Sequence, residues 1–353
     1  MWLQLSAALA AEPEVSAAAR GDAYDDGWIS VASPSARVRA ALARGWTVQG
    51  AWSSDFVSGA TPHFATDTMS SATRFTEERH GGSVDVERRL GPAWTVGAAA
   101  TLSGEHDSGV GTVGARASTD VLDAMATARV AYTLRVDQVG RVDDAAYTGN
   151  GIAHTVDAGW TAILGRTTRG SLLATFTAES CSSSPGCEAS PYRLVRADGV
   201  PVPERHPGEL DRAAVALRGA QAIGRRLALH AGARVYADSW SVIGHTEDLR
   251  LALSLADDRW LVHVGGRYAG ATPAAFAAAS YSGLPEWRTS DRELMGESTV
   301  LAGGGFAWTP PAPRPLGRVS LSGRLDHLWL SYSVAGVPSR EAWVGGGGID
   351  VDF

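Results

Sequence analysis

Three short segments decide the fold, and they read LALHAGARVY at 227–236, DLRLALSL at 248–255 and WLVHVGGRY at 260–268. Each alternates apolar and polar residues, and successive side chains of a β-strand point to opposite faces. Leu229 and Val235 therefore share one face, while His230 and Arg234 share the other. Such strands are typical of a transmembrane β-barrel, because each strand there has lipid on one side and a polar lumen on the other.

The composition of the whole chain agrees with a barrel. The 353 residues include 41 Gly, 12 Trp and 8 Tyr, and no run of 18 apolar residues occurs, which excludes a helical membrane protein. The net charge of −7 gives no reason to expect nucleic acid as a partner.

The same alternation recurs along the rest of the chain in about fifteen candidate strands, but bacterial single-chain barrels use an even number. Either a further strand lies near Tyr24 or in the loop after Thr272, or one of the fifteen candidates is not a membrane strand. Tight turns near residues 44, 91, 122, 165, 224 and 257 alternate with longer loops, as they do between the two ends of bacterial barrels. We predict an all-β fold, a transmembrane antiparallel up-and-down β-barrel of about 14 to 16 strands.

The two ends of the chain point to export and to the outer membrane. Residues 1–11 end in a small-residue, Ala-x-Ala-like site and are predicted to be a remnant or truncated signal peptide. Residues 12–26 are predicted to be a flexible lead-in, which leaves 27–353 for the barrel. The last strand, GGIDVDF, resembles the C-terminal signal that the barrel-assembly machinery reads. We therefore expect a bacterial outer-membrane protein whose partners are outer-membrane lipids, lipopolysaccharide and that machinery.

Aromatic residues near the predicted strand ends suit the interfacial girdles of a barrel, although core packing is the alternative for each. They are Trp46, Trp94, Tyr236, Trp240, Trp260, Tyr268, Trp329 and Trp343. The two cysteines, Cys181 and Cys187, lie close together in CSSSPGC. This spacing suits a small disulfide formed in an oxidising compartment, the alternative being two unpaired thiols.

Charged residues occupy the polar face of many predicted strands. Those predicted to face the lumen are Arg129, Arg135, Arg212, Arg218, Arg234, Arg250, Arg267, Arg324, Asp85, Glu87, Asp157, Asp248 and Asp326. Such charges either pair across strands and fill the interior, or line a water-filled pore. If a pore exists, the surplus of arginine favours anions.

Metal binding and catalysis find little support in the residue patterns. His245 and Glu247 would share a strand face and could chelate together. However, the cysteine and histidine spacings match no closed metal site, and the chain has no G-x-S-x-G motif and no phosphate-binding glycine loop. We therefore predict no metal, no cofactor and no enzymatic activity.

Several short strings together resemble an uncharacterised family of bacterial outer-membrane barrels that is known as a domain of unknown function. They are DFVSGATP at 55–62, FTEERH at 75–80, Pro191-Tyr192-Arg193, Glu204-Arg205-His206-Pro207, Tyr236 to Trp240 with His245-Thr246, and Tyr281 with Asp291 and Leu294. The resemblance runs from about Tyr24 to Leu294 and onward to Phe353. This chain departs from the family's pattern in two places. GEHDSG at 104–109 lacks the family's tyrosine, and Tyr268-Ala-Gly-Ala-Thr lacks its second Tyr and Gln.

The resemblance implies an outer-membrane location and a link to small lipoproteins, thioredoxin-like proteins and flavin-transfer enzymes, without an established activity. Two functions follow as expectations. The first is a transport or pore-type barrel that passes small solutes, and the second is a structural or scaffold barrel plugged by a lipoprotein in an envelope redox or assembly system. A soluble all-β protein is a lesser alternative. For either function the site residues are predicted at one extracellular rim, and they are Glu77, Arg79, His80, Tyr236, Asp238, Trp240 and His245.

Overall fold

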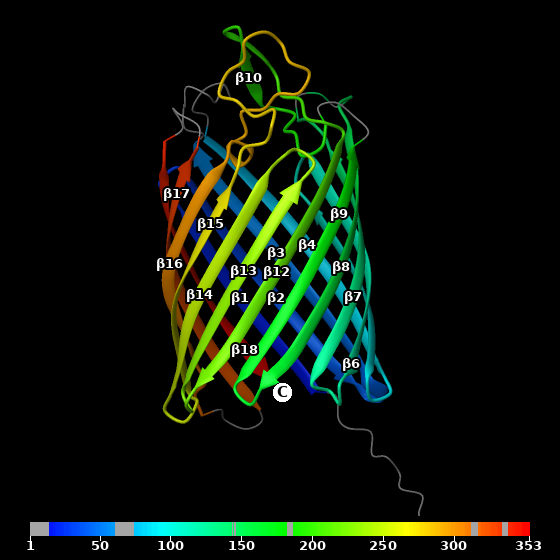
Figure 1. The fold of residues 1–353 in the computed structure, drawn as a ribbon, viewed down its shortest axis with the longest axis vertical. Coiled ribbons are helices and arrows are strands. Elements are labelled where there is room, and N and C mark those ends of the chain that lie inside the picture. The colour runs from blue at the N-terminus through cyan, green and yellow to red at the C-terminus, as the bar shows by residue number, and fades with distance from the viewer. Residues whose placement is uncertain are drawn as a thin grey trace, which may run out of the picture.

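The computed structural model describes residues 14–60, 74–142, 144, 146–181, 186–311, 317–333 and 338–353. Within them, sixteen antiparallel strands close into a single barrel (Figure 1). This confirms the predicted all-β barrel of about 14 to 16 strands. No helix in the described part of the chain is long and apolar enough to cross a membrane.

The strands of the barrel follow one another up and down around the wall. The first eight are β1 (Glu14–Asp25), β2 (Ile29–Leu42), β3 (Trp46–Ala60), β4 (Arg74–Leu90), β5 (Trp94–Gly104), β6 (Ser108–Val121), β7 (Ala126–Val139) and β8 (Gly149–Gly165). The other eight are β9 (Thr168–Cys181), β12 (Glu209–Ile223), β13 (Leu227–Asp238), β14 (Ile243–Leu255), β15 (Trp260–Ala271), β16 (Glu297–Trp308), β17 (Arg318–Tyr332) and β18 (Arg340–Asp352). Two short strands, β10 (Leu194–Ala197) and β11 (Val200–Pro203), form a separate hairpin between β9 and β12.

The N-terminal segment corrects the sequence prediction. Residues 14–25 are not a flexible lead-in but strand β1, which pairs with β18 from Ser16–Asp352 to Asp25–Trp343 and so closes the barrel. Closure leaves no unpaired strand edge, which stabilises even a strand of small side chains. The region near Tyr24 is one of the two places where a missing strand is expected, and β1 lies there. Its signal is weak because Ala17, Ala19 and Ala23 give its outward face little apolar contrast. Residues 1–11, predicted as a signal peptide, lie outside the described residues.

The two ends of the barrel differ. At the turn end, the lower end in Figure 1, tight connections such as 91–93 and 224–226 lie near the C-terminus. At the loop end, the described residues 186–208 and the connection 272–296 rise above the wall. The predicted alternation of tight turns and longer excursions therefore separates the two ends of the molecule.

The outer face of the wall is apolar and exposed. In β14, Leu249 is 56% exposed, and Leu217 in β12 and Val264 in β15 are more than 60% exposed. Partners in an antiparallel pair lie on the same face, so the pairing of Asp248 with Gly232 and Arg267 puts Asp248 and Arg267 on the opposite, interior face. Apolar side chains thus cover the outside, while charged side chains point into the barrel.

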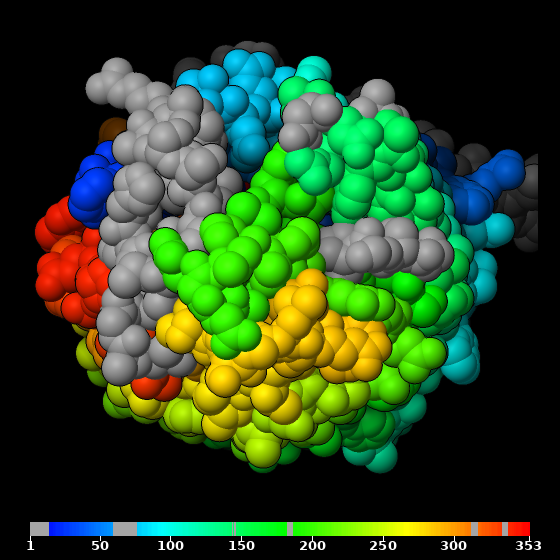
Figure 2. All heavy atoms as spheres, turned by 90° about the horizontal axis from the view of Figure 1, so that it is seen from above, coloured from blue at the N-terminus to red at the C-terminus, as the bar shows by residue number. Residues whose placement is uncertain are grey.

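Two segments at the loop end fold over the mouth of the barrel, and we call residues 186–208 and 272–296 together the plug. Seen from above, they cover the centre of the mouth (Figure 2). The two segments are joined by reciprocal backbone hydrogen bonds, with Arg205 N donating to Arg288 O at 3.0 Å and Arg288 N to Arg205 O at 2.8 Å. The mouth of the barrel is therefore covered by segments of the same chain.

Candidate functional site

An apolar cluster seats the plug on the wall. It contains Cys187, Leu210, Trp240, Val242 and Ala274, all buried. Trp240 is 4% exposed, and its ring packs edge-on against His206 and Phe276, each with a centroid distance of 5.2 Å. Its indole Nε1 donates to Glu209 O at 3.0 Å. Trp240, which follows β13, is therefore the main anchor between the plug and the barrel.

The first plug segment is held close to the wall by covalent and steric constraints. The predicted pair Cys181 and Cys187 is joined by a disulfide, with a Cα–Cα distance of 5.2 Å. Gly186 has a φ of +108°, and a Cβ atom there would lie 2.1 Å from His206 O. A glycine is therefore required where the chain passes His206.

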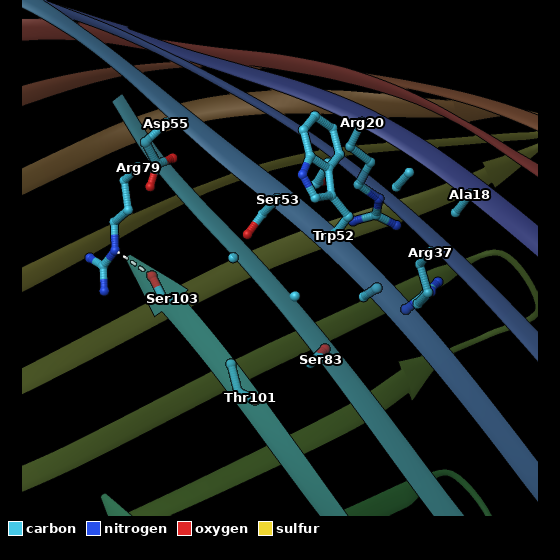
Figure 3. Close-up of a pocket in the computed structure, with 15 residues that line it drawn as sticks. Ala18, Arg20, Arg37, Trp52, Ser53, Asp55, Arg79, Ser83, Thr101 and Ser103 are labelled. Carbon is cyan, nitrogen blue, oxygen red and sulfur yellow. Dashed lines mark hydrogen bonds between the residues drawn. The ribbon is translucent and has the colours of Figure 1, made fainter. Parts of the chain in front are cut away.

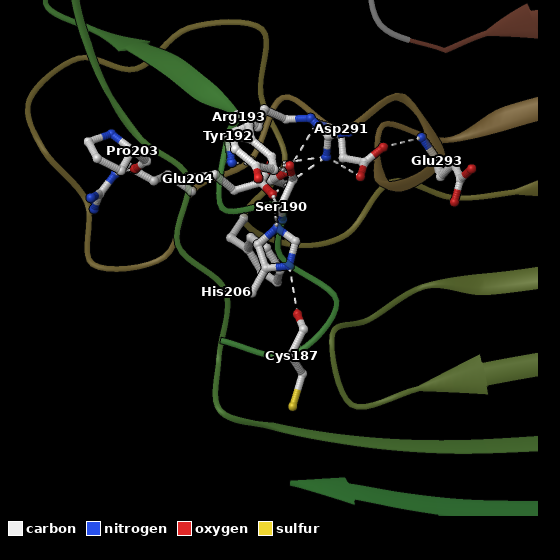
Figure 4. A network of polar contacts seen from close by, with 12 residues as sticks. Cys187, Ser190, Tyr192, Arg193, Pro203, Glu204, His206, Asp291 and Glu293 are labelled. Carbon is white, nitrogen blue, oxygen red and sulfur yellow. Dashed lines mark hydrogen bonds and ion pairs between the residues drawn. The ribbon is translucent and has the colours of Figure 1, made fainter. Parts of the chain in front are cut away.

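A buried polar network joins the two plug segments (Figure 4). Glu204 accepts hydrogen bonds from Thr289 Oγ1 at 2.6 Å and Ser190 N at 2.9 Å. Arg193 pairs with Asp291 and lies 3.3 Å from Glu204 Oε2. Below them, His206 Nε2 lies 3.4 Å from Glu204 Oε1, and its Nδ1 lies 2.9 Å from Cys187 O.

The charge state of this network follows from its contacts. Burial tends to raise the pKa of Glu204, but its hydrogen bond to His206 and the positive charge of Arg193 outweigh burial and lower that pKa below the ordinary value. Burial and the nearby Asp291 raise the pKa of Glu293. Glu204 is therefore the ionised centre that holds the plug segments together.

A cavity of about 470 Å³ remains between the plug and the wall formed by β4 to β9. The charged residues of its lining are mainly acidic and include Glu77, Glu105, Asp107, Asp137 and Glu188, beside Arg135 and Arg193. Tyr192 of the plug donates a hydrogen bond to Asp107 Oδ2 at 2.5 Å across this space. The plug therefore leaves an acidic opening at one side of the mouth.

A cluster of two arginines and three carboxylates adjoins this mouth cavity, and all of its members except Arg212 line the cavity. Glu179, whose side chain is 3% exposed, pairs with Arg212 and, at 3.1 Å, with Arg135 Nη2. Arg135 Nε also donates to Asp137 Oδ2 at 2.8 Å. Glu188 of the plug accepts from Arg212 Nη2 at 3.1 Å. These contacts connect the plug with β7, β9 and β12.

Below the plug the lumen is rich in arginine. One cavity of about 530 Å³ is lined by Arg218, Arg250, Arg267 and Arg324 together with His230, His263, Asp248 and Asp326. Within the described part of the chain, Arg218, Arg250 and Arg267 form no ion pair. Asp326 fits beside β16 because a Cβ at Gly303 would lie 2.1 Å from its Oδ1.

Other interior charges are paired. Arg116 Nη1 and Nη2 each donate to Asp85 at 2.6 Å, and Arg116 Nη2 lies 3.5 Å from Glu87. Arg324 Nη2 lies 2.9 Å from Asp22 of β1. A further cavity of about 410 Å³ lies between β1 and β5, where Arg79 Nε donates to Ser103 Oγ at 2.7 Å (Figure 3). The lumen thus combines paired charges with the unpaired Arg218, Arg250 and Arg267.

The strand registers place every charge predicted for the lumen on the interior face. These are Arg129, Arg135, Arg212, Arg218, Arg234, Arg250, Arg267, Arg324, Asp85, Glu87, Asp157, Asp248 and Asp326. The interior face is the one lined by cavities, as the cavity that contains Arg250 and Arg267 shows.

The seven residues predicted at one rim do not come together. Glu77 and Arg79 lie on the interior face of β4, and Tyr236 and Asp238 lie on that of β13. Between β4 and β13 stand β5, β6, β7, β8, β9 and β12. The two pairs are therefore on different sides of the barrel, and they do not form one site.

None of the other three residues of that set lies on the interior face of a strand. His80 is on the outer face, with its Nδ1 2.7 Å from Ser54 Oγ, because neighbouring residues of a strand point to opposite faces. His245 is also on the outer face, with Nδ1 2.9 Å from Glu247 Oε1. Trp240 is part of the plug anchor, so neither it nor the interior Tyr236 belongs to an interfacial girdle.

Sequence reasoning missed the residues that build the plug and its contact with the wall. Glu179 and Glu188 are not among the predicted site residues, and no local pattern in the sequence distinguishes them. A signal for the plug network was present in the strings that carry the family resemblance. Arg193, Glu204, His206, Tyr281 and Asp291 all occur in those strings, and the structure brings them into the plug.

Comparison with known proteins shows the fold. No family model matches the chain, and no curated protein matches it. A bacterial polysaccharide outer membrane secretin superposes with a TM-score of 0.56 at 10% identity, covering 96% of this chain and 98% of that one. CdiB from Acinetobacter baumannii superposes with a TM-score of 0.55 at 7% identity, covering 96% of this chain and 60% of that one. OccK3 (OpdO) of Pseudomonas aeruginosa gives 0.50 at 12% identity, covering 98% and 96% of the two chains. The similarity to the domain-of-unknown-function family stays a resemblance.

Proposed function

We propose that this protein is an outer-membrane pore through which small anionic solutes cross, with the plug narrowing its extracellular mouth. The apolar outer face supports the membrane location. Exposed leucine and valine side chains such as Leu217, Leu249 and Val264 are unfavourable in water but favourable against lipid tails. The fold shared with an outer membrane secretin agrees with this location.

The group of unpaired arginines in the lumen carries the proposal. Arg218, Arg250 and Arg267 line one cavity, and none of them forms an ion pair with a described carboxylate. A guanidinium group remains charged at any physiological pH, and the four arginines of this lining outnumber its two aspartates, Asp248 and Asp326, so the lining keeps a net positive charge. Rings of positive side chains favour anions in pores, whereas a lumen filled by ion pairs would be electrostatically neutral.

The alternative is a scaffold barrel plugged by a lipoprotein in an envelope redox or assembly system. The plug of this chain already covers the loop end of the barrel. A lipoprotein would therefore have to enter from the turn end. Affinity capture from native membranes tests this alternative, since a scaffold should bring down a stoichiometric lipoprotein.

Ion selectivity in planar lipid bilayers tests the pore. The refolded protein under a KCl gradient should give a reversal potential whose sign shows a preference for chloride over potassium. The triple substitution Arg218→Gln, Arg250→Gln and Arg267→Gln should move that potential towards cation selectivity. Arg166→Gln, in the tight turn between β8 and β9, is the control and should leave it unchanged. A silent barrel, or a selectivity that the triple substitution leaves intact, would refute the proposal.

A further inference from the structure

Two arginines of the wall bind two carboxylates that differ in origin. Glu179 belongs to β9, and its side chain is 3% exposed. Glu188 belongs to the plug, and its side chain is 41% exposed. Arg135 Nη2 lies 3.1 Å from Glu179 Oε2 and 3.6 Å from Glu188 Oε1. Arg212 Nη2 pairs with Glu179 and lies 3.1 Å from Glu188 Oε1. One carboxylate is thus a permanent part of the wall, while the other is brought in by the plug.

The backbone shows that Glu188 is held in place by its surroundings. Its φ is +57°, in the left-handed region that residues with a Cβ adopt rarely. It directly follows Cys187, which the disulfide joins to Cys181 at the end of β9. The disulfide therefore tethers this carboxylate close to Arg135 and Arg212.

The arginine pair stands between two cavities. Arg135 and Glu188 line the mouth cavity of about 470 Å³. Arg135 and Arg212 line a second interior cavity of about 340 Å³, together with Arg234. A solute that passes from the mouth cavity into the lumen along this side meets the two guanidinium groups.

We propose that Arg135 and Arg212 form a binding site for carboxylate-bearing solutes, which Glu188 occupies as a tethered competitor and which an incoming solute carboxylate takes over. The exchange conserves charge, because one carboxylate replaces another while Asp137 and Glu179 stay in place. Passage of the bound solute through the barrel rests on the proposed pore function. Binding of the solute at this site does not depend on it.

A tethered group competes with an effective concentration of the order of millimolar, so its removal strengthens the binding of a free competitor. We expect Glu188→Gln to bind succinate about tenfold more tightly than the unsubstituted protein, measured by isothermal titration calorimetry in detergent micelles. The double substitution Cys181→Ser and Cys187→Ser releases the tether and should act in the same direction. Glu286→Gln, an exposed carboxylate elsewhere in the plug, is the matched control and should leave succinate affinity unchanged.

Arg212→Gln in the Glu188→Gln background should abolish the gain in succinate affinity. Choline, a cation, should bind none of the variants more tightly than it binds the unsubstituted protein. Heat modifiability on a gel verifies that the barrel of each variant is folded before titration. Equal succinate affinity in Glu188→Gln, Glu286→Gln and the unsubstituted protein would overturn the proposal, as would a gain that survives Arg212→Gln. Because calorimetry requires no conduction, this result is independent of the bilayer experiment on the pore.

Discussion

Replacement of Trp240 by alanine should loosen the plug and leave the barrel folded. Trp240 is 4% exposed, packs against His206 and Phe276, and bonds Glu209 O through its indole nitrogen. Truncating a buried tryptophan to alanine costs about 3–5 kcal/mol. The plug can separate from the wall without disrupting strand pairing. We therefore expect the substitution to lower the free energy of local opening of the plug rather than that of barrel unfolding.

The magnitude translates into hydrogen exchange. Each 1.4 kcal/mol is a factor of ten, so 3–5 kcal/mol predicts about a hundredfold to a few thousandfold faster exchange of plug amides. The reporters are the amides of Arg205 and Arg288, which bond each other's carbonyls across the two plug segments. Amides of β13 and β14 in the middle of the wall, such as Leu249, should exchange at the original rate.

Two variants make this measurement specific. Trp240→Phe retains most of the ring and loses the indole hydrogen bond, which is worth about 1 kcal/mol, and should accelerate exchange by about fivefold. Trp287→Ala removes a tryptophan of the plug that is less buried than Trp240 and stacks on Arg205 at 5.2 Å, and it should have a smaller effect than Trp240→Ala. If Trp240→Ala changes exchange no more than Trp287→Ala, or if the wall amides accelerate equally, Trp240 is not the anchor.

Two further predictions concern the plug at acid pH and the outer face. The folded pKa of Glu204 is lowered, so its ionised form stabilises the plug above the ordinary carboxyl pKa of 4.5, and this stabilisation is lost as the pH falls through the folded pKa. Plug amides, corrected for intrinsic exchange, should therefore lose protection as the pH falls below 4.5, and Glu204→Gln should remove this dependence. Because the pKa of Glu293 is raised, its contribution to stability has the opposite pH dependence: it is present below pH 4.5 and is lost as the pH rises through the folded pKa. Glu293→Gln should therefore leave the loss of protection at acid pH intact. At the midpoint of β14, Leu249→Arg should destabilise the barrel in lipid vesicles by about 2–4 kcal/mol in urea unfolding, whereas Ala51→Arg, which points into an interior cavity, should cost much less. Equal costs for the two arginines would contradict the assignment of the outer face to lipid.

Most of the barrel could be predicted because its signal is local. The alternation of Leu249, Arg250 and Leu251 assigns each side chain to a face, and it requires no knowledge of the partner strand. The same rule placed Arg234, Asp248 and Arg267 towards one interior. The rule is weak at β1, where alanines replace large apolar residues and the pairing with β2 and β18 defines the strand.

The candidate site could not be predicted in the same way. Proximity to a strand end suggested a rim that joined Arg79 and His80 with Tyr236 and His245, but strand parity sends both histidines outward. Strand order then separates Arg79 from Tyr236 by half of the wall. A position near the end of a strand does not specify the face or the neighbours of a side chain.

The sequence by itself determined most of the strands, the two faces of the wall, the separation of tight turns from long loops and the close spacing of Cys181 and Cys187. Each of these depends on residues that are neighbours in the chain. Only the tertiary structure decided which charges are paired, that residues 186–208 and 272–296 cover the mouth, and that Glu188 reaches Arg212. These contacts join distant positions, as the hydrogen bond between Glu204 and Thr289 joins residues 85 apart, and no local periodicity records them.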